Sequence, residues 1–176
     1  ISTFPIKGTR ARAAQPALDE AAAAELLADP KEMAEHLMIV DLERNDLGRV
    51  CAAGSVRWSD WRIETFPDVQ HMVSEVQGRP RPGLNVWDAL QALFPGGSIT
   101  GCPKTAVVAA IDELEGAPRG AWTGSLGHHD PRTGSACWNL LIRTLEARRE
   151  SSGGWWAKVQ AGGGLVIESD PRQEVE

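Results

Sequence analysis

The 176-residue sequence predicts an α+β fold built on a mostly antiparallel sheet. Helical periodicity and strand-like alternation occur in separate blocks of the chain, which is the pattern of α+β proteins rather than of regular βαβ repeats. Hydrophobic residues make up 42% of the sequence and charged residues 24%, the balance of a globular chain with a core. The length suits one domain, and the longest apolar stretches are too short to cross a bilayer.

The N-terminal part is expected to be extended before it becomes helical. Within residues 1–12, the X-Pro step at Pro5 and the glycine at Gly8 favour a strand that runs into a loop. Residues 19–28 are rich in alanine and acidic side chains, and we expect a short helix there after a flexible stretch.

The strongest helix signal follows directly. Asp29, Pro30 and Glu32 are the residue types preferred at the N-cap, the first and the third helical positions. The helix is expected to run to about Leu47 and to end at Gly48. Its apolar side is expected to carry Met33, Leu37, Val40 and Leu42.

The rest of the chain predicts strands, then helices, then strands again. Residues 54–78 mix β-branched and aromatic side chains with Gly and Pro, which indicates two or three strands. Two helices are expected, from Gly83 or Asn85 to Phe94 and from Pro103 to Gly116. The inward side of the second is expected to hold Val107, Ala110, Ile111 and Leu114. Three strands are expected at 121–127, 136–145 and 155–167, with turns at 128–134 and 150–154.

Charge and cysteine content exclude several classes of protein. A net charge of −6 makes nucleic acid and anionic membranes poor partners. Cys51, Cys102 and Cys137 are too few and too widely spaced for a disulfide framework or a zinc site, and the N-terminal segment lacks the apolar core of a signal peptide. The expected location is the cytoplasm. The sequence starts inside an extended segment and stops inside an expected helix, so we expect a fragment of a longer protein.

An acidic pair stands near the start of the long helix. Glu32 and Glu35 are three residues apart, so both project from one face. Like charges at this spacing repel each other unless a cation lies between them, and carboxylate oxygens suit Mg²⁺. A solvated acidic helix face has the same spacing, so the pattern alone leaves both interpretations open.

Two glycine-rich segments allow a ligand to approach the backbone. Residues 96–104 form a glycine-rich turn before a helix, where backbone N–H groups favour an anion, although the order of residues is not that of a Walker A loop. Gly162, Gly163 and Gly164 interrupt a strand pattern, which indicates a bulge or a close approach. A capped turn and a tight packing site explain the two segments equally well.

Single polar residues give weaker signals. Arg143 follows three apolar residues in an expected strand, so it is either a carboxylate clamp or a surface arginine. Lys7 is either a nucleophile in an apolar pocket or an exposed lysine. His71 is most simply a structural histidine, and His128 and His129 are assigned to a turn without chemistry.

The order of these segments is more specific than any one of them. PIKGTRAR is followed by ELLADPKEMAEHLMIVDLERNDLGRV, FPGGSITGCPK, RGAWTGSLG, IRT and QAGGGLVIESDP. This succession resembles the chorismate-utilising enzymes, a family that includes anthranilate synthase component I, aminodeoxychorismate synthase component I, isochorismate synthase and salicylate synthase. Residues 1–176 resemble the C-terminal part of the family's single catalytic domain.

The resemblance implies a fold and a set of site residues. The family fold is an α/β sandwich of two packed, mostly antiparallel sheets with outer helices, and its site binds chorismate with Mg²⁺. Metal positions are matched by Glu35 as direct ligand, Glu32 as its outer neighbour and Glu174 as the first residue of a C-terminal acidic pair. Pocket positions are matched by Thr100, Trp122, Arg143, Gly162, Gly163 and Gly164, with Arg143 expected to hold a substrate carboxylate. His71 matches an active-site histidine.

Lys7 discriminates within the family. Aminodeoxychorismate synthases often have PIKGT at this position, whereas anthranilate synthases typically have PIAGT. The resemblance therefore implies that Lys7 forms a covalent adduct at C2 of chorismate, and that ammonia then adds at C4 to give 4-amino-4-deoxychorismate for para-aminobenzoate and folate synthesis. Ammonia is expected from a glutamine amidotransferase, either a separate subunit or a fused domain.

Two other functions remain open. One is the chemistry of anthranilate, isochorismate or salicylate synthases, and the other is a non-catalytic fragment that binds a partner. The family's general-acid glutamate matches no position here and its second metal glutamate would follow Glu176, so residues 1–176 alone are expected to have no turnover.

Overall fold

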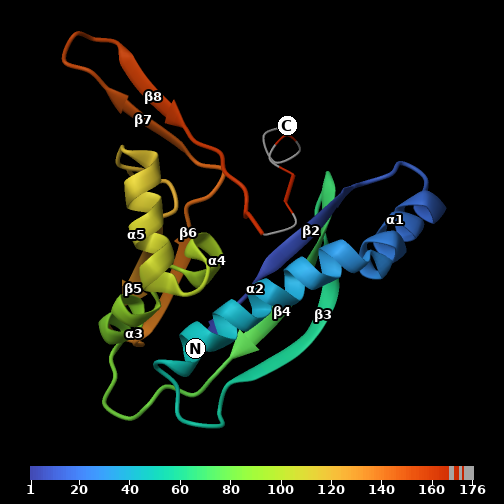
Figure 1. Cartoon of the computed structure of the whole chain (residues 1–176), viewed down its shortest axis with the longest axis horizontal. Helices are drawn as coiled ribbons and strands as arrows, with labels where there is room; N and C mark the ends of the chain where they lie inside the picture. Colours follow the sequence, from blue (N-terminus) through green and yellow to red (C-terminus); the bar gives the residue numbers. More distant parts are fainter. Residues whose placement is uncertain (167–168, 171, 173–176) are drawn as a thin grey trace. The chain divides into compact units, whose positions relative to one another are not determined.

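The computed structural model describes residues 1–166, 169–170 and 172 (Figure 1). The chain divides into two compact units, Ile1–Ala109 and Ala110–Glu176. Helices and antiparallel strands occupy separate blocks of the chain, which confirms the α+β prediction. Within the described residues, no helix is both long and apolar enough to cross a membrane.

The first unit contains a four-stranded antiparallel sheet centred on one strand. Its strands are β1 (Ser2–Thr3), β2 (Ile6–Ala11), β3 (Arg57–Thr65) and β4 (Val69–Gln77). β3 pairs along one edge of β4, and β1 and β2 follow each other along the opposite edge. The break between β1 and β2 falls at Pro5, which has no N–H to donate to the ladder. The expected N-terminal strand is thus confirmed, and residues 54–78 contribute two strands.

The helices of the first unit are α1 (Pro16–Ala28), α2 (Pro30–Gly48), α3 (Val86–Leu93) and α4 (Gly97–Thr100), and α5 (Lys104–Glu115) runs across the boundary of the two units. α1 and α2 pack on the sheet (Figure 1). α2 has the predicted bounds because the Asp29 carboxylate accepts hydrogen bonds from the first-turn N–H groups of Lys31 and Glu32. α3 likewise begins after Asn85, which forms a capping box with Asp88.

The core of the first unit lies between α2 and β4. Its buried cluster consists of Val40, Leu47, Val50, Cys51 and Val76. The expected apolar side of α2 is wrong in part, because Leu37 is 38% exposed while His36 is fully buried. The helix turns His36, Val40 and Leu47 toward the sheet, where His36 Nε2 forms a hydrogen bond with Ser74 Oγ.

The second unit contains two antiparallel hairpins. β5 (Ser125–Asp130) pairs with β6 (Ser135–Leu140), and β7 (Leu145–Arg149) pairs with β8 (Trp155–Val159). Strands were correctly predicted in this part of the chain, but their predicted bounds differ from those in the structure. The segment 136–145 is split at Arg143, whose φ of 50° is incompatible with a continuous strand.

Three further expectations for this part of the chain are corrected. His128 and His129 lie in β5 and not in a turn, because their backbones pair with Cys137 and Ala136 of β6. Residues 160–166 are not in a strand, so the glycines at 162–164 do not interrupt a ladder. The inward side predicted for α5 is wrong, since this helix has no buried residue and Leu114 is 84% exposed.

Candidate functional site

The first unit brings Lys7 of β2 against Glu35 of α2. Lys7 Nζ lies 2.6 Å from Glu35 Oε2, and the two side chains are 37% and 24% exposed. Lys31, one turn earlier on α2, reaches the other oxygen of Glu35 at 3.9 Å and is itself largely exposed. The structure thus gives the half-buried amine one close carboxylate partner.

The backbone at Gly8 explains why Lys7 reaches the helix. The register between β2 and β4 shifts between Ile6 and Thr9, and Gly8 in this irregularity has a φ of +88°. A Cβ on Gly8 would lie 2.8 Å from Leu26 Cδ1 and 3.2 Å from Glu32 Oε2. Only glycine combines this φ with so close an approach, and such a bulge re-aims the neighbouring side chain.

Glu32, the second acidic residue of the predicted pair, has a different partner. Arg10 Nη1 donates to Glu32 Oε1 at 3.2 Å, and the same guanidinium contacts Asp29 and Glu25. Lys7 and Arg10 lie three residues apart on β2, on either side of the irregularity at Gly8, and each pairs with one carboxylate of α2. The acidic pair is therefore not a freely solvated face.

A metal site was predicted from Glu35, Glu32 and Glu174. Glu174 lies outside the described residues, and within the described part no group of three or more His, Cys, Asp or Glu side chains is close enough to hold a metal ion. Glu35 and Glu32 offer the carboxylate oxygens that Mg²⁺ takes from proteins, so the chemistry of this donor set fits the ion. In the structure both carboxylates are engaged by cations.

His36, which the sequence does not single out, is fully buried close to Glu35 on α2. Its Nε2 lies 2.7 Å from Ser74 Oγ on β4, while its Nδ1 is buried without a hydrogen-bond partner. Burial lowers the pKa of His36, and the backbone of Lys7 opposes this shift. The available signal was the spacing of His36 with Val40 and Leu47, which places all three on one side of α2. His36 therefore lies between the helix that carries Glu35 and the strands of the sheet.

His71 lies on β4 beside the second half of β2. Its Nδ1 is 2.9 Å from Thr9 Oγ1, and its ring packs at a tilt against Phe66. Thr9, the backbone partner of His71, is two residues from Lys7, and the described contacts of His71 suit a structural histidine. Its assignment to the active site stays a prediction.

The glycine-rich turn is bound to the end of α2 by an ion pair that the sequence reasoning did not foresee. Asp46 is 5% exposed, and its two oxygens contact Lys104 Nζ at 2.7 Å and the Gly97 N–H at 2.8 Å. Lys104 also donates to the Leu93 carbonyl at 3.2 Å. A Cβ on Gly97 would lie 2.9 Å from Asp46 Oδ2, so the close approach requires glycine.

Thr100 ends the short helix α4 within that turn. Its hydroxyl donates to the Gly96 carbonyl at 3.1 Å and is only partly buried. Asp46 and Lys104 thus fix the backbone that carries Thr100 to the same helix that carries Glu35.

The remaining predicted residues belong to the second unit. Trp122 packs under the Arg119 guanidinium, 4.8 Å from the ring centroid, and a Cβ on Gly162 would lie 2.9 Å from the Trp122 ring. Trp122 and Gly162 are therefore brought together. Arg143 is exposed, lies outside the strands and has no carboxylate within ion-pair distance among the described side chains. Gly163 and Gly164 are also exposed.

Comparison with known proteins gives a consistent set of matches. Residues 1–176 match the model of the family described as chorismate binding enzyme. The chain is 46% identical over 175 residues to anthranilate synthase component 1 of Methanothermobacter thermautotrophicus, covering 99% of this chain and 36% of the relative. It is also 46% identical over 179 residues to aminodeoxychorismate synthase component 1 of Bacillus subtilis, again covering 99% and 36%.

Solved structures agree with these matches. Anthranilate synthase component I from Streptococcus pneumoniae superposes with a TM-score of 0.69 at 39% identity, over 82% of this chain and 31% of that one. The menaquinone-specific isochorismate synthase MenF of Escherichia coli gives a TM-score of 0.81 at 21% identity, over 99% and 38%, a likeness of fold alone. The chain spans about a third of the length of the curated relatives it matches.

Proposed function

The chain belongs to the chorismate-binding enzyme family, and on this premise we propose that it is part of an aminodeoxychorismate synthase component 1. The proposed reaction converts chorismate and ammonia to 4-amino-4-deoxychorismate, a precursor of para-aminobenzoate and folate. Residues 1–176 form the C-terminal part of one catalytic domain in this proposal.

The observation that carries the proposal is the contact between Lys7 and Glu35. A primary amine stands half-buried beside a carboxylate, on a strand held by a glycine bulge. A lysine that attacks a carbon atom must first lose a proton, and Glu35 Oε2 at 2.6 Å is an acceptor within reach.

The proposed covalent steps balance as follows. The neutral Lys7 amine adds at C2 of chorismate, the ring double bonds shift, and the C4 hydroxyl leaves with a proton as water. Ammonia then adds at C4, the double bonds shift back, and Lys7 leaves C2 as the amine. The enolpyruvyl group is retained throughout.

Mg²⁺ is proposed as the cofactor, held by Glu35 with Glu32 and Glu174 as the other acidic residues near it. When bound, the ion supplies positive charge for the anionic substrate and the departing hydroxyl. Glu32 is in turn oriented by Arg10.

The other proposed roles follow the family positions. His71 is proposed to act near the ring of the substrate, and Arg143 is proposed to hold a substrate carboxylate. The proposed pocket wall consists of Thr100, Trp122, Gly162, Gly163 and Gly164. The exposed guanidinium of Arg143 has no carboxylate partner among the described residues, which leaves its charge available for a ligand.

Ammonia is proposed to come from a glutamine amidotransferase. The names of the curated relatives describe them as component 1, which supports a second component as the partner.

Anthranilate synthase chemistry is the second candidate. It is favoured by the equal 46% identity to an anthranilate synthase component 1. Isochorismate or salicylate synthase chemistry is a further form of this alternative, supported by the 27% identity to a putative isochorismate synthase from Bacillus anthracis. Lys7 is the residue that separates the aminodeoxychorismate proposal from these.

Mass spectrometry of the full-length protein tests the covalent step. Chorismate with Mg²⁺ and without ammonia is expected to add the mass of chorismate less one water to the peptide that contains Lys7. Lys7→Ala should remove this adduct and lower ammonia-dependent turnover by at least about a hundredfold. Lys31→Ala is the matched control, since Lys31 also contacts Glu35 but is largely exposed. Unchanged turnover by Lys7→Ala would refute the covalent proposal.

A thermal-shift measurement distinguishes a protein that binds chorismate from a non-catalytic fragment that binds only a partner. Chorismate plus Mg²⁺ is expected to raise the melting temperature of the full-length protein. No shift would favour the non-catalytic, partner-binding alternative.

A further inference from the structure

The described cations of the first unit that have no carboxylate partner gather in one place. Those that form ion pairs are Lys7, Arg10, Arg12, Lys31, Arg44, Arg62 and Lys104. Those without a carboxylate partner among the described side chains are Arg49, Arg57, Arg79 and Arg81. Although the chain has a net charge of −6, these four arginines make the surface around them locally positive.

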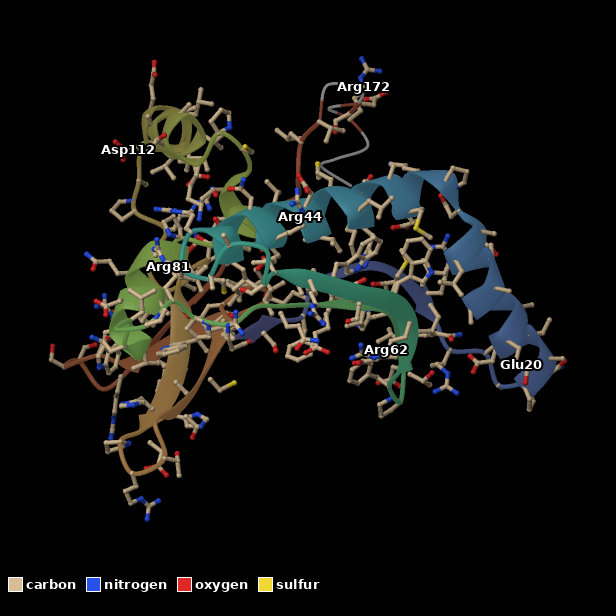
Figure 2. All side chains as sticks on the ribbon, turned by 90° about the horizontal axis from the view of Figure 1, so that it is seen from below. Glu20, Arg44, Arg62, Arg81, Asp112 and Arg172 are labelled. Atoms are coloured by element: carbon tan, nitrogen blue, oxygen red, sulfur yellow. The ribbon has the colours of Figure 1, made fainter. Side chains whose placement is uncertain are left out.

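The fold holds these arginines together at the C-terminal end of α2. Arg49 is the C-cap residue of the helix, and its carbonyl accepts a hydrogen bond from Arg81 Nη2. The Arg81 N–H donates to the Val50 carbonyl at 2.9 Å. Figure 2 shows Arg81 near this end of α2, whereas Arg62 lies toward the other end of the sheet.

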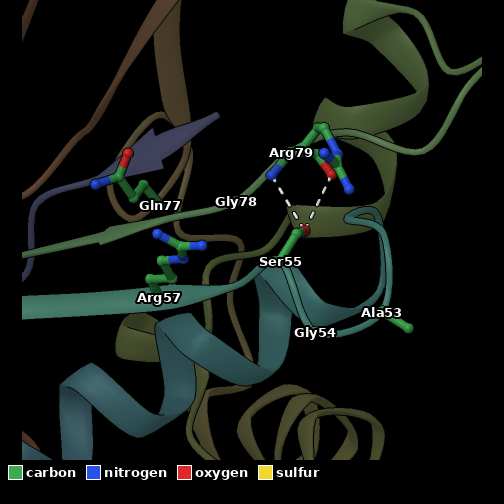
Figure 3. A pocket seen from close by; sticks show the side chains of 7 residues that line it. All are labelled: Ala53, Gly54, Ser55, Arg57, Gln77, Gly78 and Arg79. Atoms are coloured by element: carbon green, nitrogen blue, oxygen red, sulfur yellow. Dashed lines mark hydrogen bonds between the residues drawn. The ribbon is translucent and has the colours of Figure 1, made fainter.

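A hollow of about 390 Å³ opens between the other two arginines (Figure 3). Arg57 and Gln77 face each other across β3 and β4, and Arg79 follows directly after β4. No acidic residue lines the hollow. The guanidiniums and the Gln77 amide therefore offer donors to a ligand, and no acceptor of opposite charge competes within the hollow.

Two further residues keep the hollow formed. The Ser55 hydroxyl accepts a hydrogen bond from the Arg79 N–H at 3.2 Å and donates to the Ala52 carbonyl at 2.7 Å, which fixes the backbone of Arg79. A Cβ on Gly78 would lie 2.6 Å from Cys51 Sγ, so no side chain is tolerated there. The wall between the two arginines consequently stays free of a side chain.

We propose that this hollow is a binding site for a small anion with a phosphate or carboxylate head group. The planar fork of a guanidinium matches both head groups with two hydrogen bonds. Neither Lys7 nor Glu35 lines the hollow, and Arg49, at the end of α2 beside it, follows Glu35 by fourteen residues. The site is therefore separate from the proposed catalytic residues and does not depend on the proposed reaction.

Calorimetry of the full-length protein at low ionic strength tests the site with inorganic phosphate and with citrate as probes. Saturable binding of at least one probe is expected. Arg57→Gln and Arg79→Gln should each weaken it by about tenfold or more. Arg62→Gln on the same strand removes the same charge but belongs to an ion pair with Glu64, and it should leave affinity within about twofold.

The two probes distinguish the head groups, since binding of phosphate alone indicates a phosphorylated ligand and binding of citrate alone a polycarboxylate. Arg79→Lys keeps the charge and the fold but loses the fork, so it should bind more weakly than the wild type and more tightly than Arg79→Gln. The proposal is wrong if neither probe binds, or if Arg62→Gln weakens binding as much as Arg79→Gln.

Discussion

The Lys7 ammonium and the Glu35 carboxylate approach to 2.6 Å and join β2 to the first half of α2. Both side chains are partly buried, so water screens this ion pair less than a surface pair and more than a fully buried one. Glu35 is also the residue proposed to hold the metal. In the proposed reaction one carboxylate would therefore serve both the amine and the metal.

A double-mutant cycle measures this contact. Lys7→Met, Glu35→Gln and the double variant should give a coupling free energy of about 0.5–1 kcal/mol in urea unfolding, because partly exposed pairs are screened by water. Coupling indistinguishable from zero would show that the pair is not formed in solution.

Gly8 should tolerate alanine less well than a glycine of nearly the same φ. Gly8 (+88°) would place a Cβ 2.8 Å from Leu26, whereas Gly83 (+86°) has open space around it. Both variants carry the backbone cost, about 1 kcal/mol. Gly8→Ala adds a steric cost of about 1–3 kcal/mol in the free energy of unfolding. Equal losses in the two variants would contradict the close packing of β2 against α1.

Removing the Asp46 carboxylate should be among the most destabilising single changes. Asp46→Ala leaves the Gly97 N–H and the largely buried Lys104 ammonium without their partner, at a cost of about 3 kcal/mol. Asp46→Asn keeps an acceptor for Gly97 and should cost less. Urea denaturation monitors both variants, and a reversed order would argue against the hydrogen bond to Gly97.

Asp19 should make the stability of the first unit depend on pH. Hydrogen bonds from Arg12, and then from the Ala13 N–H, hold the pKa of Asp19 below its usual range. The unfolded state therefore binds the proton more readily. The contribution is complete above the ordinary aspartate pKa of about 3.9 and is lost as the pH falls through the lower, folded-state pKa.

The stability difference between wild type and Asp19→Asn should accordingly shrink as the pH is lowered from about 6 to about 3. Chemical denaturation at several pH values gives this difference. A gap that stays constant over the range would mean that the carboxylate has the same pKa in both states.

Gly162→Ala should displace the Trp122 ring, because the new Cβ would lie 2.9 Å from it. Gly154→Ala is the matched control, since the nearest atom to its Cβ position is 3.9 Å away and Gly154 lies outside the proposed pocket. If Trp122 lines the substrate pocket, chorismate affinity of the full-length protein should fall by about tenfold in the first variant only. Similar affinities in both variants would remove Trp122 from the proposed pocket.

Local chemistry explains why some elements were predictable. The start of α2 is determined by residues that are neighbours in the sequence, because Asp29 caps the N–H groups of the next turn. The bounds of β6 and β7 could not be predicted in this way, because the strand pattern of the sequence continues through Arg143 while the backbone turns there. Strand ends depend on pairing partners, which a propensity pattern does not contain.

The sequence indicated which residues belong to the candidate site, but it did not indicate which of them contact each other. Helix spacing placed Glu32 and Glu35 on one face, but it could not show that β2 supplies Lys7 to one and Arg10 to the other. The Asp46–Lys104 pair joins residues far apart in the sequence, so neither stood out before the fold was known.

Among the described strands, β4 alone is hydrogen-bonded along both edges over most of its length, with β3 on one side and β1 and β2 on the other. The hairpins of the second unit have single ladders. Amide hydrogens along β4 will consequently exchange with deuterium last, and those of β5 to β8 early. Among the described strands, the one that carries His71 and Ser74 is thus expected to open last.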